Sequence, residues 1–139
     1  MILLDNQTNV DIDIKELEKI ANFLNVNKDI ELLIVDNNTI KQLNKEYRGK
    51  DKPTDVLSFP LQDLEFMPLG SIVISSDFAK DASLKFNHSL KEEITLLFIH
   101  GLLHLLGYDH EIDNGQMREK EEFLIKKFNL PNSLIVRNN

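Results

Sequence analysis

The sequence predicts an α+β fold, a single domain in which about five helices cover one mixed sheet of about four strands. Two observations indicate this class. Short β-branched or apolar runs of strand length lie mostly in the first half of the 139 residues, and the longest helical patterns lie in the second half. No repeat, low-complexity run or flexible linker divides the chain, so we expect residues 1–139 to form one domain.

Four segments have the strand pattern, in which apolar or β-branched residues form a short run bounded by polar or turn-forming residues. They are Ile2–Leu4, Ile30–Val35, Val56–Phe59 and Gly70–Ser75. Gln62–Pro68, between the last two, is expected to be a loop. Such a sheet has to bury its apolar residues against helices.

Five segments place apolar residues at helical spacing. They run over about 14–24, 38–47, 77–86, 90–106 and 114–128. Two pairs have the capping-box spacing, Asp13 with Glu16 and Ser89 with Glu92, and the other candidate N-terminal caps are Asn37 or Asn38 and Asp77. The fourth helix is the most apolar, and four of its leucines are assigned to the core: Leu96, Leu97, Leu103 and Leu106.

The composition excludes several kinds of site. There is no cysteine, so disulfides and thiolate metal sites are excluded, and a transition metal has to be held by His, Asp or Glu. The lack of cysteine fits the reducing cytoplasm, and the N-terminus does not have the pattern of a signal peptide. The most apolar stretch, near Ile94–Leu106, is too short to span a membrane. We therefore expect a cytoplasmic protein with no membrane partner.

Three of the four histidines lie within eleven residues, in the segment His100-Gly-Leu-Leu-His104-Leu-Leu-Gly107-Tyr-Asp-His110. His100 and His104 are four residues apart on a predicted helix, so they lie about 40° apart on one face. Gly107 can adopt the left-handed conformation that ends a helix, after which His110 can reach the same point. Three imidazoles with a fourth position left open are typical of a catalytic zinc, so we expect one zinc ion per chain at these histidines.

The histidine spacing matches that of the metzincin peptidases, which have histidines at the first, fifth and eleventh positions and glycine at the eighth. Those enzymes need Glu directly after the first histidine as the general base, and this sequence has Gly101 there. A peptidase would lack the group that deprotonates its water, so a hydrolase of another class is favoured. The fourth histidine, His88, stands alone, and we interpret it as a surface residue before a helix cap.

The net charge of the chain is −7 at pH 7, which disfavours broad, non-specific binding to nucleic acid. Residues 41–52 differ, because five basic residues stand there against two acidic ones, a net charge of +3. One interpretation is a solvated helix face that runs into a loop. The other is a local phosphate-binding patch in an otherwise acidic protein.

The segment 100–110 also resembles the signature of the YbeY family, the bacterial endoribonucleases of ribosomal-RNA maturation. Further blocks extend the resemblance to nearly the whole chain: Leu43-Asn44, Tyr47-Arg48, Thr54–Pro60, Leu69–Ser75, and Met117 with Glu121. One position departs, since the family usually has Gly-Asp-Ile within the block Leu69–Ser75 and this chain has Ser71 in place of the acid. No role of that carboxylate is therefore carried over to this chain.

The resemblance implies a zinc endoribonuclease that hydrolyses phosphodiester bonds in ribosomal RNA, acts in rRNA maturation and ribosome quality control, and has the small ribosomal subunit as a partner. It also implies that the three histidines hold the zinc and that an arginine lies near the metal, which corresponds to Arg48. A guanidinium can pair bidentately with phosphate and stabilise the negative charge that develops during hydrolysis. The basic segment around Arg48 then favours the phosphate-patch interpretation.

Several alternatives stay open. Arg48 could instead form an ion pair with a neighbouring acid. Asp55 is interpreted as a cap or turn residue, and Thr54 and Ser58 as hydrogen-bonding supports. Asp109 could orient a ligand histidine or form part of the turn after the helix. For the whole protein, the alternatives are a zinc hydrolase of another substrate, such as a peptide, and a ribosome assembly factor that is not an enzyme and whose metal is structural.

Overall fold

The computed structural model describes residues 1–132, and its strands form one four-stranded sheet in the order β1-β2-β4-β3. The strands are β1 (Ile2–Asn6), β2 (Ile30–Val35), β3 (Val56–Pro60) and β4 (Gly70–Ser75). β1, β2 and β4 run parallel, and β3 runs antiparallel to β4, so the predicted mixed sheet is confirmed. The last seven residues of the predicted domain, 133–139, lie outside the described residues.

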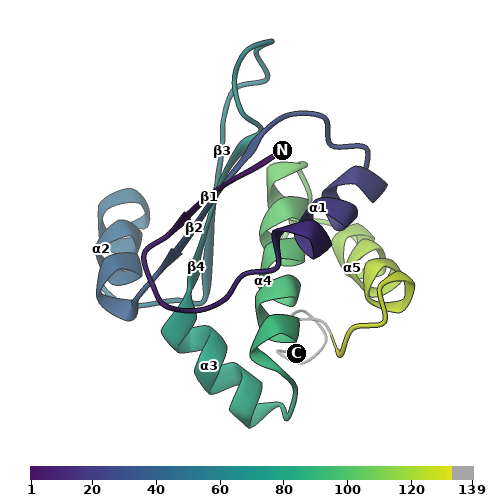
Figure 1. Ribbon diagram of the computed structural model, residues 1–139. Helices are drawn as coiled ribbons and strands as arrows, with labels where there is room; N and C mark the ends of the chain where they lie inside the picture. Colours follow the sequence, from purple (N-terminus) through teal and green to yellow (C-terminus); the bar gives the residue numbers. More distant parts are fainter. Residues whose placement is uncertain (133–139) are drawn as a thin grey trace.

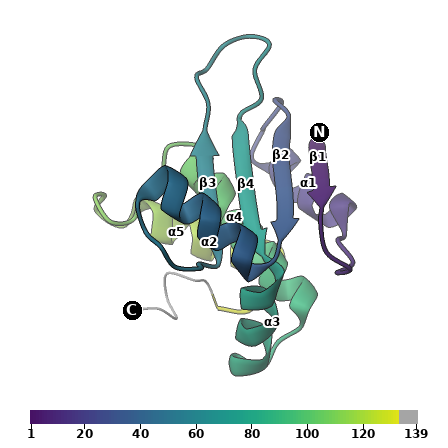
Figure 2. The same cartoon turned by 90° about the vertical axis from the view of Figure 1, so that its left-hand side faces the viewer.

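Five helices cover both faces of this sheet within residues 1–132. They are α1 (Ile14–Phe23), α2 (Asn37–Arg48), α3 (Ser76–Lys85), α4 (Leu90–Leu105) and α5 (Gln116–Lys127). α2 packs on one face, whereas α4 packs on the other, with α1 and α5 outside it (Figure 1). α3 continues from β4 and lies beyond the C-terminal ends of β2 and β4 (Figure 2). The predicted α+β class is therefore confirmed.

The strands divide their apolar side chains between the two faces. On the α2 side, Val35, Leu57 and Val73 form a small cluster with Ile40 of α2. The opposite face packs against α1 and α4 and forms the main core, which includes Leu32, Ile34, Ile72, Ile74, Leu97, Phe98 and Leu102. The alternation of the strands thus places α2 and α4 on opposite sides of β3 and β4.

α4 is buried over most of its surface, as its apolar sequence predicts. Of the leucines assigned to the core, Leu96, Leu97 and Leu103 are fully buried. The assignment of Leu106 is wrong, because the helix ends at Leu105 and Leu106 is its C-terminal cap, 37% exposed. Although α4 is apolar, neither it nor another helix of the described residues has the length and hydropathy needed to cross a membrane.

Two helix starts differ from the predicted caps. α2 is capped by the carboxylate of Asp36, and not by Asn37 or Asn38. α3 is capped by Ser75, and Asp77 instead accepts a hydrogen bond from the backbone N–H of Asn37 at 2.9 Å. The reason is tertiary, because β2 and β4 are neighbours in the sheet, so that the helices after them start side by side and share polar contacts.

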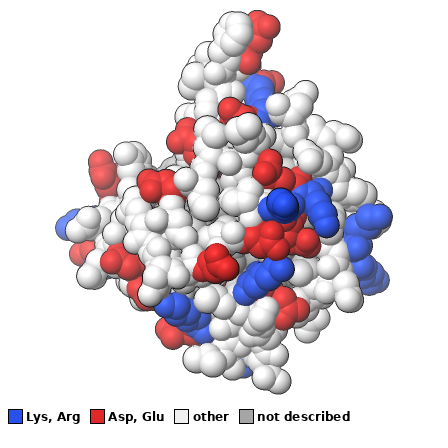
Figure 3. Space-filling view, viewed as in Figure 1, with Lys and Arg blue, Asp and Glu red and all other residues white. Residues whose placement is uncertain are grey.

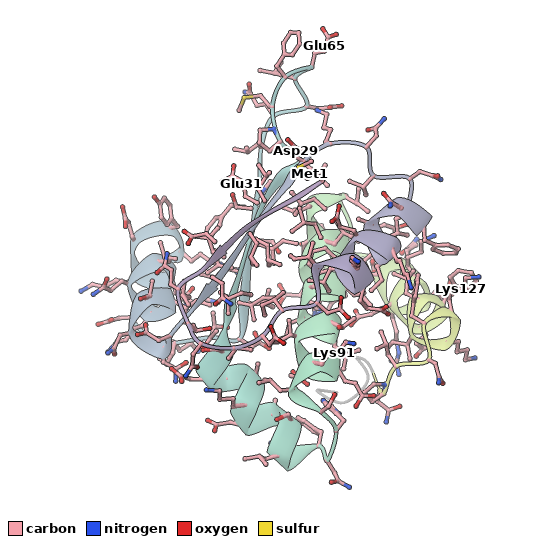
Figure 4. All side chains as sticks on the ribbon, in the orientation of Figure 1. Met1, Asp29, Glu31, Glu65, Lys91 and Lys127 are labelled. Carbon is pink, nitrogen blue, oxygen red and sulfur yellow. The ribbon has the colours of Figure 1, made fainter. Side chains whose placement is uncertain are left out.

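Of the two predicted capping boxes, one forms completely. Ser89 Oγ accepts a hydrogen bond from the Glu92 N–H at 3.0 Å, and Glu92 Oε1 accepts one from the Ser89 N–H at 2.9 Å. Asp13 accepts from the Glu16 N–H at 3.2 Å, but among residues 1–132 no return bond from the Glu16 side chain is present. Asp13 pairs instead with Lys91 at 2.9 Å, which ties the start of α1 to the first turn of α4 (Figure 4).

The predicted loop between β3 and β4 projects beyond the sheet, with Glu65 near its tip (Figure 4). Lys28 Nζ contacts the first arm of this loop through Asp63 Oδ1 at 2.6 Å and the Leu64 carbonyl at 2.9 Å. The loop thus extends the antiparallel pair of β3 and β4 beyond the sheet.

Candidate metal centre

His100 and His104 lie one turn apart on α4, and His110 follows the bend at the end of this helix. Gly107 has a φ of +99°, in the left-handed region that favours glycine, and its N–H donates to the His104 carbonyl at 3.0 Å. The Tyr108 N–H donates to the Leu103 carbonyl, also at 3.0 Å, which completes the Schellman pattern of a glycine cap. The chain therefore reverses and brings His110 beside the two helical histidines.

The three imidazoles form a cluster with the dimensions of a metal site. One ring nitrogen of each lies within 4.8 Å of the others, and the ring centroids are 4.9 to 5.9 Å apart. Burial lowers the pKa of His104 below its ordinary value of 6.5, and the neighbouring His100 and His110 lower it further. The neutral form of His104, which is the form that binds a metal, is therefore favoured at neutral pH.

The residues present fit a transition-metal ion. Three neutral imidazoles are a donor set that suits zinc and its neighbours in the first transition row. His110 Nδ1 is buried and has no hydrogen-bond partner among residues 1–132, an arrangement that costs free energy unless another group satisfies the ring. His100, His104 and His110 can therefore bind one metal ion together.

The histidines form one wall of a cleft of about 520 Å³, and Arg48, Asp55, Ser58 and Tyr108 are among the other residues that line it. Arg48 is the last residue of α2 and reaches the cleft from the opposite side of the sheet edge. Within residues 1–132 its guanidinium has no carboxylate within 4.0 Å, whereas the nearby Lys45 pairs with Asp51 at 4.0 Å. The ion-pair alternative for Arg48 therefore finds no support in the structure.

The polar residues of β3 and of the turn before it support the cleft wall. Ser58 Oγ donates to the Gly101 carbonyl of α4 at 3.1 Å. Asp55 Oδ1 accepts hydrogen bonds from the Thr54 hydroxyl at 3.3 Å and the Val56 N–H at 2.8 Å. These contacts are the turn and support roles expected for Asp55, Thr54 and Ser58.

Asp109 lies between two of the clustered residues, and its contacts are those of a turn. Its carboxylate accepts from the Glu111 N–H at 3.0 Å, and its carbonyl accepts from the N–H groups of Ile112 and Asp113. Of the two interpretations of Asp109, the structure thus favours the turn.

Glu121 of α5 is the carboxylate that contacts one of the three histidines, with Oε2 at 3.4 Å from His100 Nδ1. The sequence did contain a signal for it. Met117, Glu121 and Leu124 stand four and three residues apart, which places this acid on the apolar face of an amphipathic helix. The resemblance included Glu121 but assigned it no role.

Two further residues lie away from the cleft. The interpretation of His88 as a surface residue is wrong: its side chain is 7% exposed, and its Nε2 lies 2.7 Å from Oε1 of the buried Glu93. The left-handed Asn87, with a φ of +58°, turns the chain between α3 and α4 so that the ring packs inward. Ser71, which replaces the family's acid, pairs in the middle of the sheet with β2 and β3 and does not line the cleft.

Gly101 has no room for the carboxylate of a peptidase. A Cβ added there would lie 2.9 Å from Ile72 Cγ2 and 3.1 Å from Ser58 Oγ. Gly101→Glu should therefore lower the free energy of unfolding by about 3 kcal/mol or more, because it overpacks the contact between α4 and the sheet and buries an unpaired charge. Urea titration measures this loss, and a peptidase assay should show no gain of activity.

Leu84→Glu is the control for this substitution, because Leu84 is 82% exposed on α3. It adds the same side chain and should change the free energy of unfolding by no more than about 0.5 kcal/mol. A loss at Gly101→Glu as small as that of the control would contradict the tight packing of α4 on the sheet.

Comparison with known proteins agrees with this geometry. The family model described as Endoribonuclease YbeY matches residues 4–129. Proteins named Endoribonuclease YbeY from Nautilia profundicola and Helicobacter pylori are 62% and 56% identical, over 99% of this chain and 99% and 98% of theirs. A solution structure of a Thermotoga maritima protein matches with a TM-score of 0.62 at 30% identity, over 92% of this chain and 89% of that one. The chain therefore belongs to the Endoribonuclease YbeY family.

Proposed function

We propose that this chain, as one domain over residues 1–139, is a zinc-dependent endoribonuclease that hydrolyses phosphodiester bonds in ribosomal RNA. The observation that carries the proposal is the cleft in which Arg48 and the cluster of His100, His104 and His110 face the same space. A histidine cluster that can bind a metal ion and a guanidinium in the same cleft suit a substrate that is anionic and gains further negative charge during hydrolysis. The relatives that carry the endoribonuclease name support RNA as the substrate.

Zinc is the proposed metal, at one ion per chain. The chain has no cysteine, and three imidazoles leave one tetrahedral position open, which is the pattern of catalytic rather than structural zinc. When bound, zinc polarises phosphoryl oxygens and lowers the pKa of water at the site to about 7. The lowered pKa of His104 supports binding at neutral pH, since a protonated imidazole has no free lone pair.

Arg48 is the proposed catalytic residue. Its planar guanidinium can donate two parallel hydrogen bonds to phosphate oxygens. Because no carboxylate neutralises it among residues 1–132, it can hold the reacting phosphate against the histidine wall and stabilise the charge on the non-bridging oxygens. Ser58 and Asp55 support the β3 side of the cleft through their hydrogen bonds. Among the residues that line the cleft, Arg48 is the one Lys or Arg side chain.

The distribution of charge limits where RNA can approach. On the face shown in Figure 3, acidic and basic side chains are interspersed. The whole chain has a net charge of −7. The segment 41–52, with its net charge of +3, ends α2 and adjoins the cleft through Arg48. We therefore expect the RNA backbone to enter from the α2 side.

The wider role rests on the resemblance in residues 43–60 and 100–110. It comprises rRNA maturation and ribosome quality control, with the small ribosomal subunit as partner and the cytoplasm as compartment. A peptidase is disfavoured because Gly101 stands where the general base would be and packs against the sheet. A non-enzymatic assembly factor with a structural metal is disfavoured because structural zinc normally has four protein ligands, whereas here three histidines face an open cleft.

The test removes the metal from the wild-type protein. After treatment with a chelator and removal of the chelate, cleavage of a ribosomal-RNA fragment should fall to the level of a buffer blank, because no nucleophile is activated. One equivalent of zinc should restore cleavage, as followed by gel electrophoresis of labelled RNA. An unstructured peptide should stay intact under both conditions.

Each contrary outcome favours a different alternative. RNA cleavage that persists without metal would refute the zinc mechanism. Cleavage of the peptide would favour the peptidase. Zinc-loaded protein that binds small ribosomal subunits but leaves RNA intact would favour the assembly factor.

A further inference from the structure

Glu121 is a carboxylate buried in the apolar layer behind the histidines. It lies on α5 and is 0% exposed. The apolar layer between α5, α4 and α1 contains the buried residues Ile20, Ile99, Leu103, Met117 and Leu124. Acidic residues are almost never fully buried unless a partner compensates for their lost hydration. The position of Glu121 therefore indicates a function beyond packing.

The contact that the structure gives Glu121 is with His100. Its Oε2 lies 3.4 Å from His100 Nδ1, and its Oε1 has no hydrogen-bond partner among residues 1–132. Because a carboxylate can only accept, the contact places the imidazole proton on Nδ1. The Nε2 atom of His100 then keeps its lone pair and is the nitrogen that can bind a metal.

We infer that Glu121 is a positioning residue, which holds His100 in the tautomer and the orientation that present Nε2 to the metal. The inference rests on the proposed zinc site. An imidazole bound to a divalent cation is a stronger N–H donor than a free one, so the buried carboxylate is better compensated when the metal is bound. Glu121 thus raises metal affinity and adds little to the stability of the metal-free fold.

A purely structural role would have a different signature. A carboxylate that held α5 against α4 would be needed with or without metal, and its loss would lower the stability of both forms. In the metal-free protein, however, the one contact that the structure gives Glu121 within residues 1–132 is a single imidazole at 3.4 Å, and apolar side chains lie around it on α4 and α5. Replacing such a poorly compensated charge by an uncharged group of the same shape should leave the metal-free fold intact.

The chain offers a matched control in the pair of His88 and Glu93. The side chains of this pair are 7% and 1% exposed and lie 2.7 Å apart, against 13% and 0% exposed and 3.4 Å for His100 and Glu121. Glu93 is in the first turn of α4, and neither member of the pair lines the cleft. Replacing Glu93 therefore removes a buried carboxylate from a histidine without touching the metal site.

The experiment measures zinc affinity, by competition with a chromophoric chelator, and the thermal midpoint of the metal-free full-length protein. We expect Glu121→Gln to bind zinc about 10- to 100-fold more weakly than the wild type, the scale for losing a group that orients a ligand. Its metal-free midpoint should equal or exceed that of the wild type. Glu93→Gln should keep the wild-type zinc affinity. Glu121→Asp, which keeps the charge but not the reach, should restore only part of the affinity.

Unchanged zinc affinity in Glu121→Gln would overturn the inference and leave the proposed function intact. A metal-free Glu121→Gln that melts below the wild type, or does not fold, would assign a structural role and overturn it too. Failure of the wild type and of Glu93→Gln to bind zinc would overturn the proposed function itself, so the two failures are distinguishable.

Discussion

Replacing His104 with alanine is expected to leave the purified protein without stoichiometric zinc and without RNA cleavage. Two imidazoles would remain, whereas catalytic zinc sites normally have three protein ligands. The two that remain are His100 and His110, and Glu121 would still contact the ring of His100. Elemental analysis of the purified variant, beside the RNA-cleavage assay, measures both losses.

His88→Ala is the control for this experiment, because it also removes a histidine, but one that lies outside the cleft. It should keep one zinc ion per chain, even though it leaves Glu93 without its histidine. The midpoint of His104→Ala should lie near that of chelated wild-type protein, since metal-binding free energy contributes to the stability of the fold. Retention of one zinc ion by His104→Ala would contradict the assignment of the ligands.

Arg48→Ala should lower the rate of RNA cleavage by about 100-fold or more, with zinc content and thermal midpoint nearly unchanged. The guanidinium lines the cleft and has no carboxylate partner among residues 1–132, so its removal breaks no ion pair there. What is lost is the stabilisation of charge on the phosphate. Single-turnover cleavage of a labelled ribosomal-RNA fragment, with zinc analysis and a thermal melt of the same sample, checks the three parts.

Two further variants separate position from charge. Arg48→Lys should recover only part of the activity, because an ammonium cannot make the bidentate contact. Lys41→Ala removes one positive charge from the same helix but does not line the cleft, so it should cost little activity. If Arg48→Ala unfolds the protein, Arg48 is structural after all. If it cleaves RNA as well as the wild type, the basic segment is only a solvated face.

The approach of the three histidines could be predicted from the sequence because it is local. Residues 100–110 comprise one helical turn and one glycine bend, and helix geometry alone puts His100 and His104 on one face. The four strands and five helices were predictable for the same reason, since a hydrophobic period is a property of a short segment. The ends moved by a few residues, as at α5, which was expected over about 114–128 and spans Gln116–Lys127.

Only the tertiary structure decided which distant residues meet. Arg48 reaches the cleft because β3 pairs with β4 at the sheet edge and brings the end of α2 close to the end of α4. Glu121 contacts His100 because α5 packs on α4, and His88 is buried because the turn after α3 folds its ring inward. Burial favours any arrangement that covers an apolar face, so a local pattern shows that the face is covered but not what covers it. The strand order and the contacts between helices determine what covers each face, and they bring Arg48 and Glu121 to the histidines.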